Sequence, residues 1–160
     1  MKKSNLIAAI CLILVAVVSL VYFFVFEKED EEKDKEIAKD VKISAVKEDT
    51  SDGFKTNEMK FENTSITLDV TINHPGSSAI YNVTITNSKD KDVTLKAISG
   101  IEAANNLDPE ALKYEVSDIQ VGDVIEAGDS LDFKIKATWD GESSESGSLT
   151  KKTTISFTFE

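Results

Sequence analysis

The chain has 160 residues, with 18 basic and 29 acidic side chains that give a formal net charge of −11. So acidic a chain is poorly suited to binding nucleic acid or to lying flat on anionic lipid, because both need a basic surface. The charge is divided unevenly, with +2 in residues 1–26, −4 in residues 27–40 and −9 in residues 41–160. We interpret these three segments as an anchor, a spacer and a globular domain.

The first segment contains a run of uncharged residues, Leu6–Phe26, between Lys3 and Glu27. As an α-helix this run would span about 30 Å, the thickness of the hydrocarbon core of a bilayer. A cleaved secretory signal needs a shorter apolar stretch that ends in small residues, whereas this one ends in the bulky Val21–Phe26. A lipoprotein signal needs small residues before its cysteine, whereas Cys11 follows an isoleucine. We therefore predict an uncleaved signal anchor over residues 1–26.

The positive flank sets the predicted orientation of the anchor. Lys2 and Lys3 favour a cytoplasmic N-terminus, which places residues 27–160 outside the cell. The predicted location is the cell membrane, crossed once. Residues 27–40 read EKEDEEKDKEIAKD and have no apolar stripe to pack. They predict a charged helical stalk or an extended linker, and either one would act as a spacer.

The segment that follows the anchor contains no cysteine. This absence favours a prokaryotic cell surface, since eukaryotic secreted sandwiches of this size often carry a disulfide. Two N-x-[ST] sequons occur, at Asn63 and Asn82. They are glycosylation acceptors in an archaeon or a eukaryote and chance matches in a bacterium.

From Val41 onward, apolar and polar residues alternate with a period of two, which is typical of antiparallel strands with one face on a core. Turn residues separate the runs. The predicted strands are Val41–Val46, Ile66–Ile72, Ala79–Ile85, Val93–Ala97, Lys113–Ser117, Val124–Glu126, Leu131–Trp139 and Ile155–Phe159. Between them, Ile101–Leu112 predicts a short helical crossover with Asp108 as N-cap and Pro109 at the first helical position.

About seven or eight short strands predict an all-β fold, an Ig-like antiparallel β-sandwich over residues 41–160. We expect the last strand, within Thr153–Glu160, to pair either inside the domain or, from a sheet edge, with another chain in a fibre. The predicted large core residues are Phe61, Tyr81, Tyr114, Phe133, Phe157 and Phe159.

The sequence offers little for catalysis. His74 is the single histidine, so a Ser–His–Asp hydrolase would have to use it, and no G-x-S-x-G motif is present. A zinc site needs several histidine or cysteine ligands. We therefore predict that the protein is not an enzyme and that it has no catalytic residue, metal site or cofactor.

Two groups of oxygen-bearing side chains have the composition of a calcium site. Asp90 and Asp92 follow Asn87 and Ser88, but lysines intervene and the central glycine and distal glutamate of an EF-hand are missing. We interpret this segment as a solvated hairpin turn. A second acidic group is interpreted in the same way: Asp123, Asp129 and Asp132.

Trp139 is the single tryptophan and ends the Leu131–Trp139 alternation in phase, which predicts a core position. The alternative is an aromatic platform for a sugar ring, with Asp140 and Glu142 accepting hydrogen bonds from its hydroxyl groups.

Three stretches resemble secreted and surface Ig-like domains of bacteria and archaea, a group that includes CARDB-like modules and the TasA-like surface proteins of Gram-positive bacteria. Their pattern of a strand, an N-x-G/S turn and a D-x-x-L motif resembles two neighbouring stretches of this chain. These are Tyr81–Ser88, which would supply the strand and the turn, and Asp92–Leu95, which would supply the motif. Val124–Phe133 resembles their late turn and strand, and Ile155–Phe159 their closing strand. The resemblance implies a cell-surface sandwich used for adhesion, assembly or spacing. TasA-like chains carry a cleavable signal, whereas we expect an uncleaved anchor in this chain, and the metallopeptidase motif H-E-x-x-H is absent from it.

The sequence therefore predicts a membrane-anchored, non-enzymatic surface protein that presents one Ig-like domain to another protein or to the cell envelope. The alternatives are a subunit of a surface fibre and a module that binds glycan or calcium.

Overall fold

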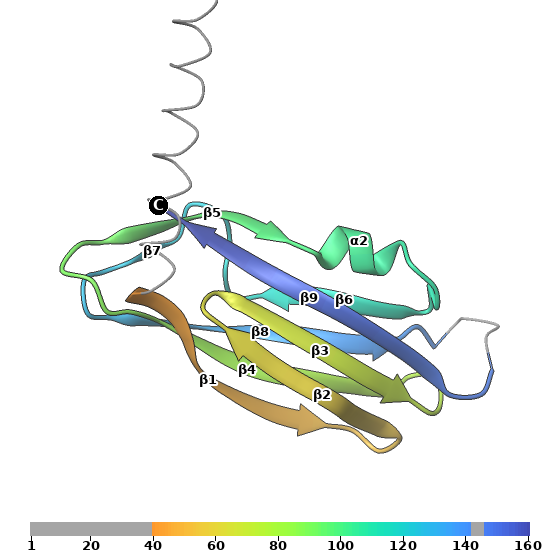
Figure 1. Ribbon diagram of the computed structural model, residues 1–160. Coiled ribbons are helices and arrows are strands. Elements are labelled where there is room, and N and C mark those ends of the chain that lie inside the picture. The colour runs from red at the N-terminus through yellow and green to blue at the C-terminus, as the bar shows by residue number, and fades with distance from the viewer. Residues whose placement is uncertain (1–39, 142–145) are drawn as a thin grey trace, which may run out of the picture. The chain divides into compact units, whose positions relative to one another are not determined.

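The computed structural model describes residues 40–141 and 146–160, which form two antiparallel sheets packed face to face (Figure 1). The four-stranded sheet has the order β1-β4-β8-β6, and the five-stranded sheet has the order β2-β3-β9-β5-β7. The elements are β1 (Val41–Thr50), β2 (Phe54–Glu62), β3 (Ser65–Ile72), β4 (Ser78–Asn87), β5 (Val93–Ser99), α2 (Ile101–Asn105), β6 (Leu112–Ser117), β7 (Val124–Ile125), β8 (Ser130–Trp139) and β9 (Leu149–Phe159). The predicted β-sandwich is confirmed. The predicted anchor and almost all of the spacer lie outside the described residues.

One hydrophobic core lies between the sheets, built from the alternate residues that each strand turns inward. The rings of Phe133 in the four-stranded sheet and Phe157 in the five-stranded sheet meet there, with their centroids 4.7 Å apart. The other predicted core aromatics are buried as well, with one exception. Phe61 is 46% exposed because it lies near the end of β2, an edge strand that has a neighbour on one side only.

The order of the strands departs from the Ig arrangement, in which consecutive strands such as D and E or F and G are hydrogen-bonded neighbours. Among the described strands, β2 and β3 are the one consecutive pair that shares a ladder. From β3 to β9 every connection crosses from one sheet to the other. Such alternation is typical of jelly-roll sandwiches.

One strand prediction is corrected, and the two alternatives for the closing strand are decided. β2 was not predicted, because its sequence FKTNEMKFE is rich in charge and a bulge between Thr56 and Glu58 interrupts its alternation. Of the two alternatives for the closing strand, pairing inside the domain is the one observed, because β9 lies between β3 and β5 with a ladder on each side. It therefore has no free edge to offer to another chain while the fold is intact.

The predicted helical crossover exists, but it begins earlier than expected. α2 starts directly after Gly100, and Asp108 and Pro109 lie in the turns that follow the helix. Gly100 has φ +93°, and a Cβ at this position would lie 2.0 Å from the carbonyl oxygen of Thr154. Because the chain passes so close to the backbone of β9 at this position, the residue must be a glycine. The helix begins at the next residue, Ile101.

The first and last described residues lie at the same end of the sandwich, which we call the entry end. The carbonyl of Asp40 accepts a hydrogen bond from the backbone N–H of Ser88 at 2.7 Å. Glu160 exchanges backbone hydrogen bonds with Thr94 at 2.9 and 3.0 Å. At the opposite end, which we call the far end, lie the connections 51–53, 73–77 and 106–111.

Candidate functional site

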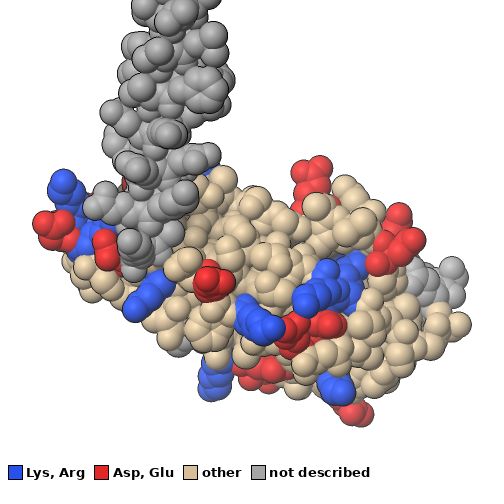
Figure 2. Space-filling view, in the orientation of Figure 1, with Lys and Arg blue, Asp and Glu red and all other residues tan. Residues whose placement is uncertain are grey.

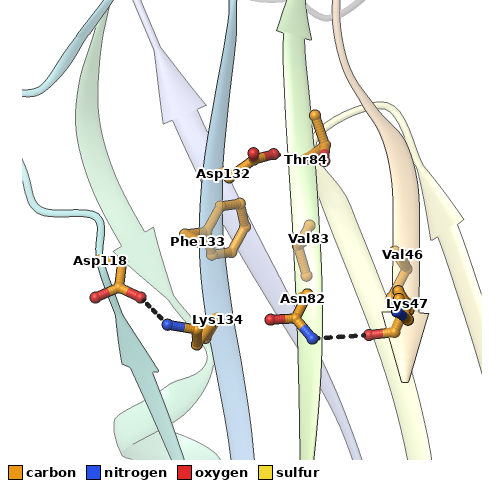
Figure 3. A pocket seen from close by; sticks show the side chains of 9 residues that line it. All are labelled: Val46, Lys47, Asn82, Val83, Thr84, Asp118, Asp132, Phe133 and Lys134. Carbon is orange, nitrogen blue, oxygen red and sulfur yellow. Dashed lines mark hydrogen bonds and ion pairs between the residues drawn. The ribbon is translucent and has the colours of Figure 1, made fainter. Parts of the chain in front are cut away.

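The outer face of the four-stranded sheet carries a hollow of about 390 Å³ that crosses β1, β4 and β8 (Figure 3). Asp118, just beyond the end of β6, closes one side of it. Polar side chains from different strands point into this hollow because outward-facing residues alternate with core residues along each strand. The lining residues are Val46, Lys47, Asn82, Val83, Thr84, Asp118, Asp132, Phe133 and Lys134.

A bulge positions Lys47 in the hollow. The register of β1 against β4 shifts between Ile43 and Ala45, which moves the following residues to the opposite face of the sheet. Lys47 therefore lies opposite Asn82, on the outer face. Without the bulge, the simple alternation that begins at Val41 would turn Lys47 toward the core.

Hydrogen bonds inside the hollow use most of its charged groups. The hydroxyl of Thr84 donates to Oδ1 of Asp132 at 2.6 Å, and Nζ of Lys134 lies 2.7 Å from Oδ2 of Asp118. The amide of Asn82 donates to the backbone carbonyl of Lys47 at 3.5 Å, the long limit for a hydrogen bond. With two lysines and two aspartates the hollow is balanced in charge. It is equipped to exchange hydrogen bonds with a polar ligand.

The sequence indicated the hollow only in part. Asn82 was singled out as a sequon and Asp132 as a calcium candidate, each for a reason unrelated to this site. Lys47, Asp118 and Lys134 carried no local signal, because they come together only when β1, β4, β8 and the end of β6 assemble.

The structure brings Ser77 to His74 at the far end, a pairing that the sequence analysis did not predict. Nδ1 of His74 lies 2.8 Å from the hydroxyl of Ser77, which donates to the backbone carbonyl of Asp52 at 3.0 Å. A serine nucleophile must instead give its proton to the histidine. Ser77 is also buried, with 3% of its surface exposed. The pair ties the β3–β4 loop to the β1–β2 turn.

The first calcium candidate is a turn built around a buried amide. Asn87 has no exposed surface, and its Nδ2 donates to the carbonyls of Lys91, Ile125 and Glu126 at 2.8–3.2 Å. Its Oδ1 accepts the backbone N–H of Lys89 at 3.0 Å, so the side chain organises the turn from within. The nearby Oδ1 of Asp92 accepts the N–H of Ala127.

The second acidic group is not brought together. Asp132 lies in the hollow with Thr84, whereas Oδ2 of Asp123 accepts the N–H of Gln120 in the β6–β7 connection. The backbone carbonyl of Asp129 accepts the N–H of Asn87. Within residues 40–141 and 146–160, no group of three or more His, Cys, Asp or Glu side chains is placed to hold a metal ion.

Trp139 is fully buried, as its phase in the strand predicted. It has no face to offer a sugar ring, so the aromatic platform is ruled out. Its Nε1–H has no acceptor among the described residues. Asp140 is exposed, and Glu142 lies outside the described part of the chain.

The two sequons differ in their surroundings. Asn63 is exposed in the turn between β2 and β3, with φ +51°. Asn82 is half-buried within β4, in the hollow.

Charges of both signs are interspersed on the face shown in Figure 2. Glu58 contacts Lys60 and lies 2.6 Å from Nζ of Lys152. The hydrogen bond from Lys152, followed by that from Lys60, lowers the pKa of Glu58 to about 2, and the same contact raises the pKa of Lys152. This mixture gives no large field of one sign on this face.

No protein-family model, curated protein or solved structure matches the chain. In the part of the chain that the structure describes, no helix combines the length and hydropathy needed to cross a membrane.

Proposed function

We propose that this protein is a membrane-anchored, non-enzymatic surface protein that holds a single β-sandwich outside the cell for contact with another protein or with the envelope. The observation that carries the proposal is the uncharged run Leu6–Phe26, flanked by Lys2 and Lys3 on one side and by the charged spacer on the other. A run of this length is sufficient to cross the hydrocarbon core, and the lysines favour a cytoplasmic N-terminus.

The shape of the sandwich supports a display role. The chain enters at Asp40, beside Ser88, so the connections at the far end point away from the entry end. The connections at the entry end carry the exposed acidic residues Asp90, Asp92, Glu126 and Asp129 beside two lysines, Lys89 and Lys91, so these connections are net acidic. Anionic lipid repels such an end, and together with the charged spacer this repulsion would hold the domain off the bilayer. The far end would then be the part presented to a partner.

A non-enzymatic role is also supported by the residues with catalytic potential. The single histidine contacts a serine that is buried and donates its own proton to a backbone carbonyl. That geometry stabilises a corner of the fold and activates no nucleophile.

The test is the topology of the full chain in intact cells. In a Cys11→Ser background, Leu107→Cys places a thiol at a far-end position that is 60% exposed, and Ser4→Cys places one on the cytoplasmic side of the anchor. A membrane-impermeant maleimide is expected to label Leu107→Cys in intact cells and Ser4→Cys only after lysis. Labelling of Leu107→Cys only after lysis, or a mature N-terminus at or beyond Glu27, would contradict the proposal.

A second candidate function is glycan binding, and the hollow of Figure 3 is the observation that favours it. Lys47 and Asn82 lie side by side there with donors and acceptors for vicinal hydroxyl groups. A polysaccharide that binds is expected to raise the melting temperature of the protein, and Lys47→Ala is expected to remove this shift. Lys55→Ala, at an exposed lysine of the other sheet, is the matched control. If the shift survives in Lys47→Ala, the site lies elsewhere.

A further inference from the structure

β6 is the edge strand of the four-stranded sheet on the side opposite β1. In an antiparallel ladder, every second residue of an edge strand turns its N–H and C=O away from the neighbouring strand. On β6 these residues are Leu112, Tyr114 and Val116, as the contacts of Tyr114 with Asn105 show. The groups of Leu112 are already used within the chain, because its N–H donates to the carbonyl of Pro109 at 3.2 Å and its C=O accepts from Lys151. The groups of Tyr114 and Val116 are the ones that a second chain could reach. Exposed groups of this kind are a template for pairing with another chain, so proteins cover or disrupt such edges.

Asn105, the last residue of α2, covers the centre of this edge. Its Oδ1 accepts the N–H of Tyr114 at 2.7 Å, and its Nδ2 donates to the carbonyl of the same residue at 2.9 Å. One side-chain amide thus makes both hydrogen bonds that a residue of a neighbouring strand would make. Asn105 occupies the place of a fifth strand.

Lysines hold this cover in position. Nζ of Lys113 donates to the backbone carbonyl of Asn105 at 2.8 Å. The buried Lys151 reaches from β9 and donates to the carbonyls of Ala104 and Leu112 at 2.9 and 2.8 Å. The C-terminal end of α2 is therefore fixed against the start of β6 by hydrogen bonds to the carbonyls of Ala104 and Asn105.

The other edges are disrupted in different ways. β1 and β2 each carry a bulge, between Ile43 and Ala45 and between Thr56 and Glu58. β7 consists of two residues, which is too short for extended pairing. β6 has six residues with an unbroken register against β8, so it is the regular edge that most needs a cover.

We propose that Asn105 is an edge guard that keeps the sandwich monomeric by closing β6 against a second copy of the same chain. Without it, two β6 strands would pair antiparallel about a two-fold axis and join two four-stranded sheets into one. The inference goes beyond the proposed display function. On a membrane the local concentration of neighbouring copies is high, so a closed edge leaves the far end free for its partner.

The test compares Asn105→Asp with Asn106→Asp, the same change of charge at the next residue, whose side chain is exposed. Asn105→Asp keeps the acceptor for the N–H of Tyr114 but sets a second oxygen against its carbonyl. We expect the full chain with Asn105→Asp, in detergent micelles, to shift from monomer to dimer with rising concentration in sedimentation velocity. Wild type and Asn106→Asp should both stay monomeric under the same conditions.

The dimer should depend on the outward N–H groups of β6. Val116→Pro removes one of them, so adding it to Asn105→Asp is expected to restore the monomer. A folded Asn105→Asp protein that remains monomeric would overturn the proposal. A dimer that persists with Val116→Pro would do so too, because pairing would then use another surface. If Asn105→Asp and Asn105→Ala both lose the cooperative unfolding transition, Asn105 is needed for the monomer to fold, which equally contradicts a guarding role.

Discussion

On one side of the sandwich, β1 and β2 follow each other along the chain and meet through the Ser51–Gly53 turn; we call this the β1–β2 side. On the other side, which we call the α2 side, α2 bridges β6 and β9. Each side must close the gap between the two sheets, and the chain uses different chemistry for each. The β1–β2 side combines one backbone hydrogen bond, from the N–H of Ile43 to the carbonyl of Asn63 at 2.7 Å, with contacts between side chains. The α2 side is joined by side chains that bind backbone groups.

The β1–β2 side contains a short chain of polar side chains that leads outward from the core. The buried hydroxyl of Tyr81 lies 2.7 Å from the hydroxyl of Thr56, which in turn contacts the carboxylate of Glu48. Side chains can shift their rotamers when a neighbour changes, so we expect this side to adjust to substitutions.

The α2 side depends on backbone carbonyls that are fixed by the ladders around them. Lys151 and Asn105 supply donors to Leu112 and Tyr114, and Gly100 packs directly on the backbone of Thr154. A backbone group within a sheet moves only if the sheet moves. We therefore expect substitutions on the α2 side to cost more than comparable ones on the β1–β2 side.

The largest expected difference is between two glycines, both with positive φ. A Cβ at Gly100 would lie 2.0 Å from the backbone oxygen of Thr154, whereas a Cβ at Gly53 would meet the imidazole of His74 at 2.2 Å. The ring of His74 can turn away and the backbone cannot. We expect Gly100→Ala to lower the free energy of unfolding by about 3 kcal/mol and Gly53→Ala by about 1.5 kcal/mol. Denaturant unfolding followed by the fluorescence of Trp139 measures both, and equal losses would contradict the comparison.

Two neighbouring lysines provide a second comparison. Lys151 is 4% exposed and binds two buried carbonyls, whereas Lys152 points outward to Glu58. We expect Lys151→Met to lower the free energy of unfolding by about 2 kcal/mol, because it removes the lysine donor from the buried carbonyls of Leu112 and Ala104, of which Ala104 keeps the N–H of Leu107. Lys152→Met should change it much less, because an ion pair between exposed side chains contributes little to stability. If Lys152→Met were the more costly of the two, the assignment of Lys151 would be wrong.

A smaller effect than at Gly100 or Lys151 is expected at Tyr81, on the β1–β2 side. Tyr81→Phe removes one hydroxyl whose partner Thr56 keeps its contact with Glu48, so we expect a loss of about 1 kcal/mol near neutral pH. Burial, with a smaller contribution in the same direction from the carboxylate of Glu48, raises the pKa of Tyr81 to about 12, while the hydrogen bond with Thr56 acts in the opposite direction.

The pH dependence of stability follows from that shift. The ordinary pKa is 10.0, so the unfolded chain loses this proton first as the pH rises. The contribution of Tyr81 to stability is complete below pH 10 and is lost as the pH rises through 12. The difference in unfolding free energy between wild type and Tyr81→Phe should therefore shrink across this interval. A difference that stays constant would contradict the assigned pKa.

The alternation of residues predicted most of the fold because burial of one face of a strand is a local property. Tyr81, Tyr114 and Phe133 were assigned to the core from phase alone, and each is buried. The prediction failed where the local pattern is interrupted, as at the bulge of β2. It also failed at the crossover, where Asp108 and Pro109 gave a stronger helix-start signal than Gly100.

The candidate site was less predictable than the fold. The hollow joins Lys47, Asn82 and Lys134 from three strands, and their proximity depends on which strands become neighbours. The contact of Asn105 with Tyr114 likewise depends on the path of the crossover.

The sequence alone indicated that most of the strands after Val41 are half-buried, and it predicts an anchor in Leu6–Phe26, because both patterns follow from hydropathy along a short stretch of chain. Only the tertiary structure decided that β9 lies inside a sheet, that Lys151 faces inward and that Asn105 covers an edge. The physical reason is that hydrogen bonds between strands join residues far apart in the sequence. The local pattern determines which face of a strand is buried, but it does not determine which other strands lie beside it in the sheet.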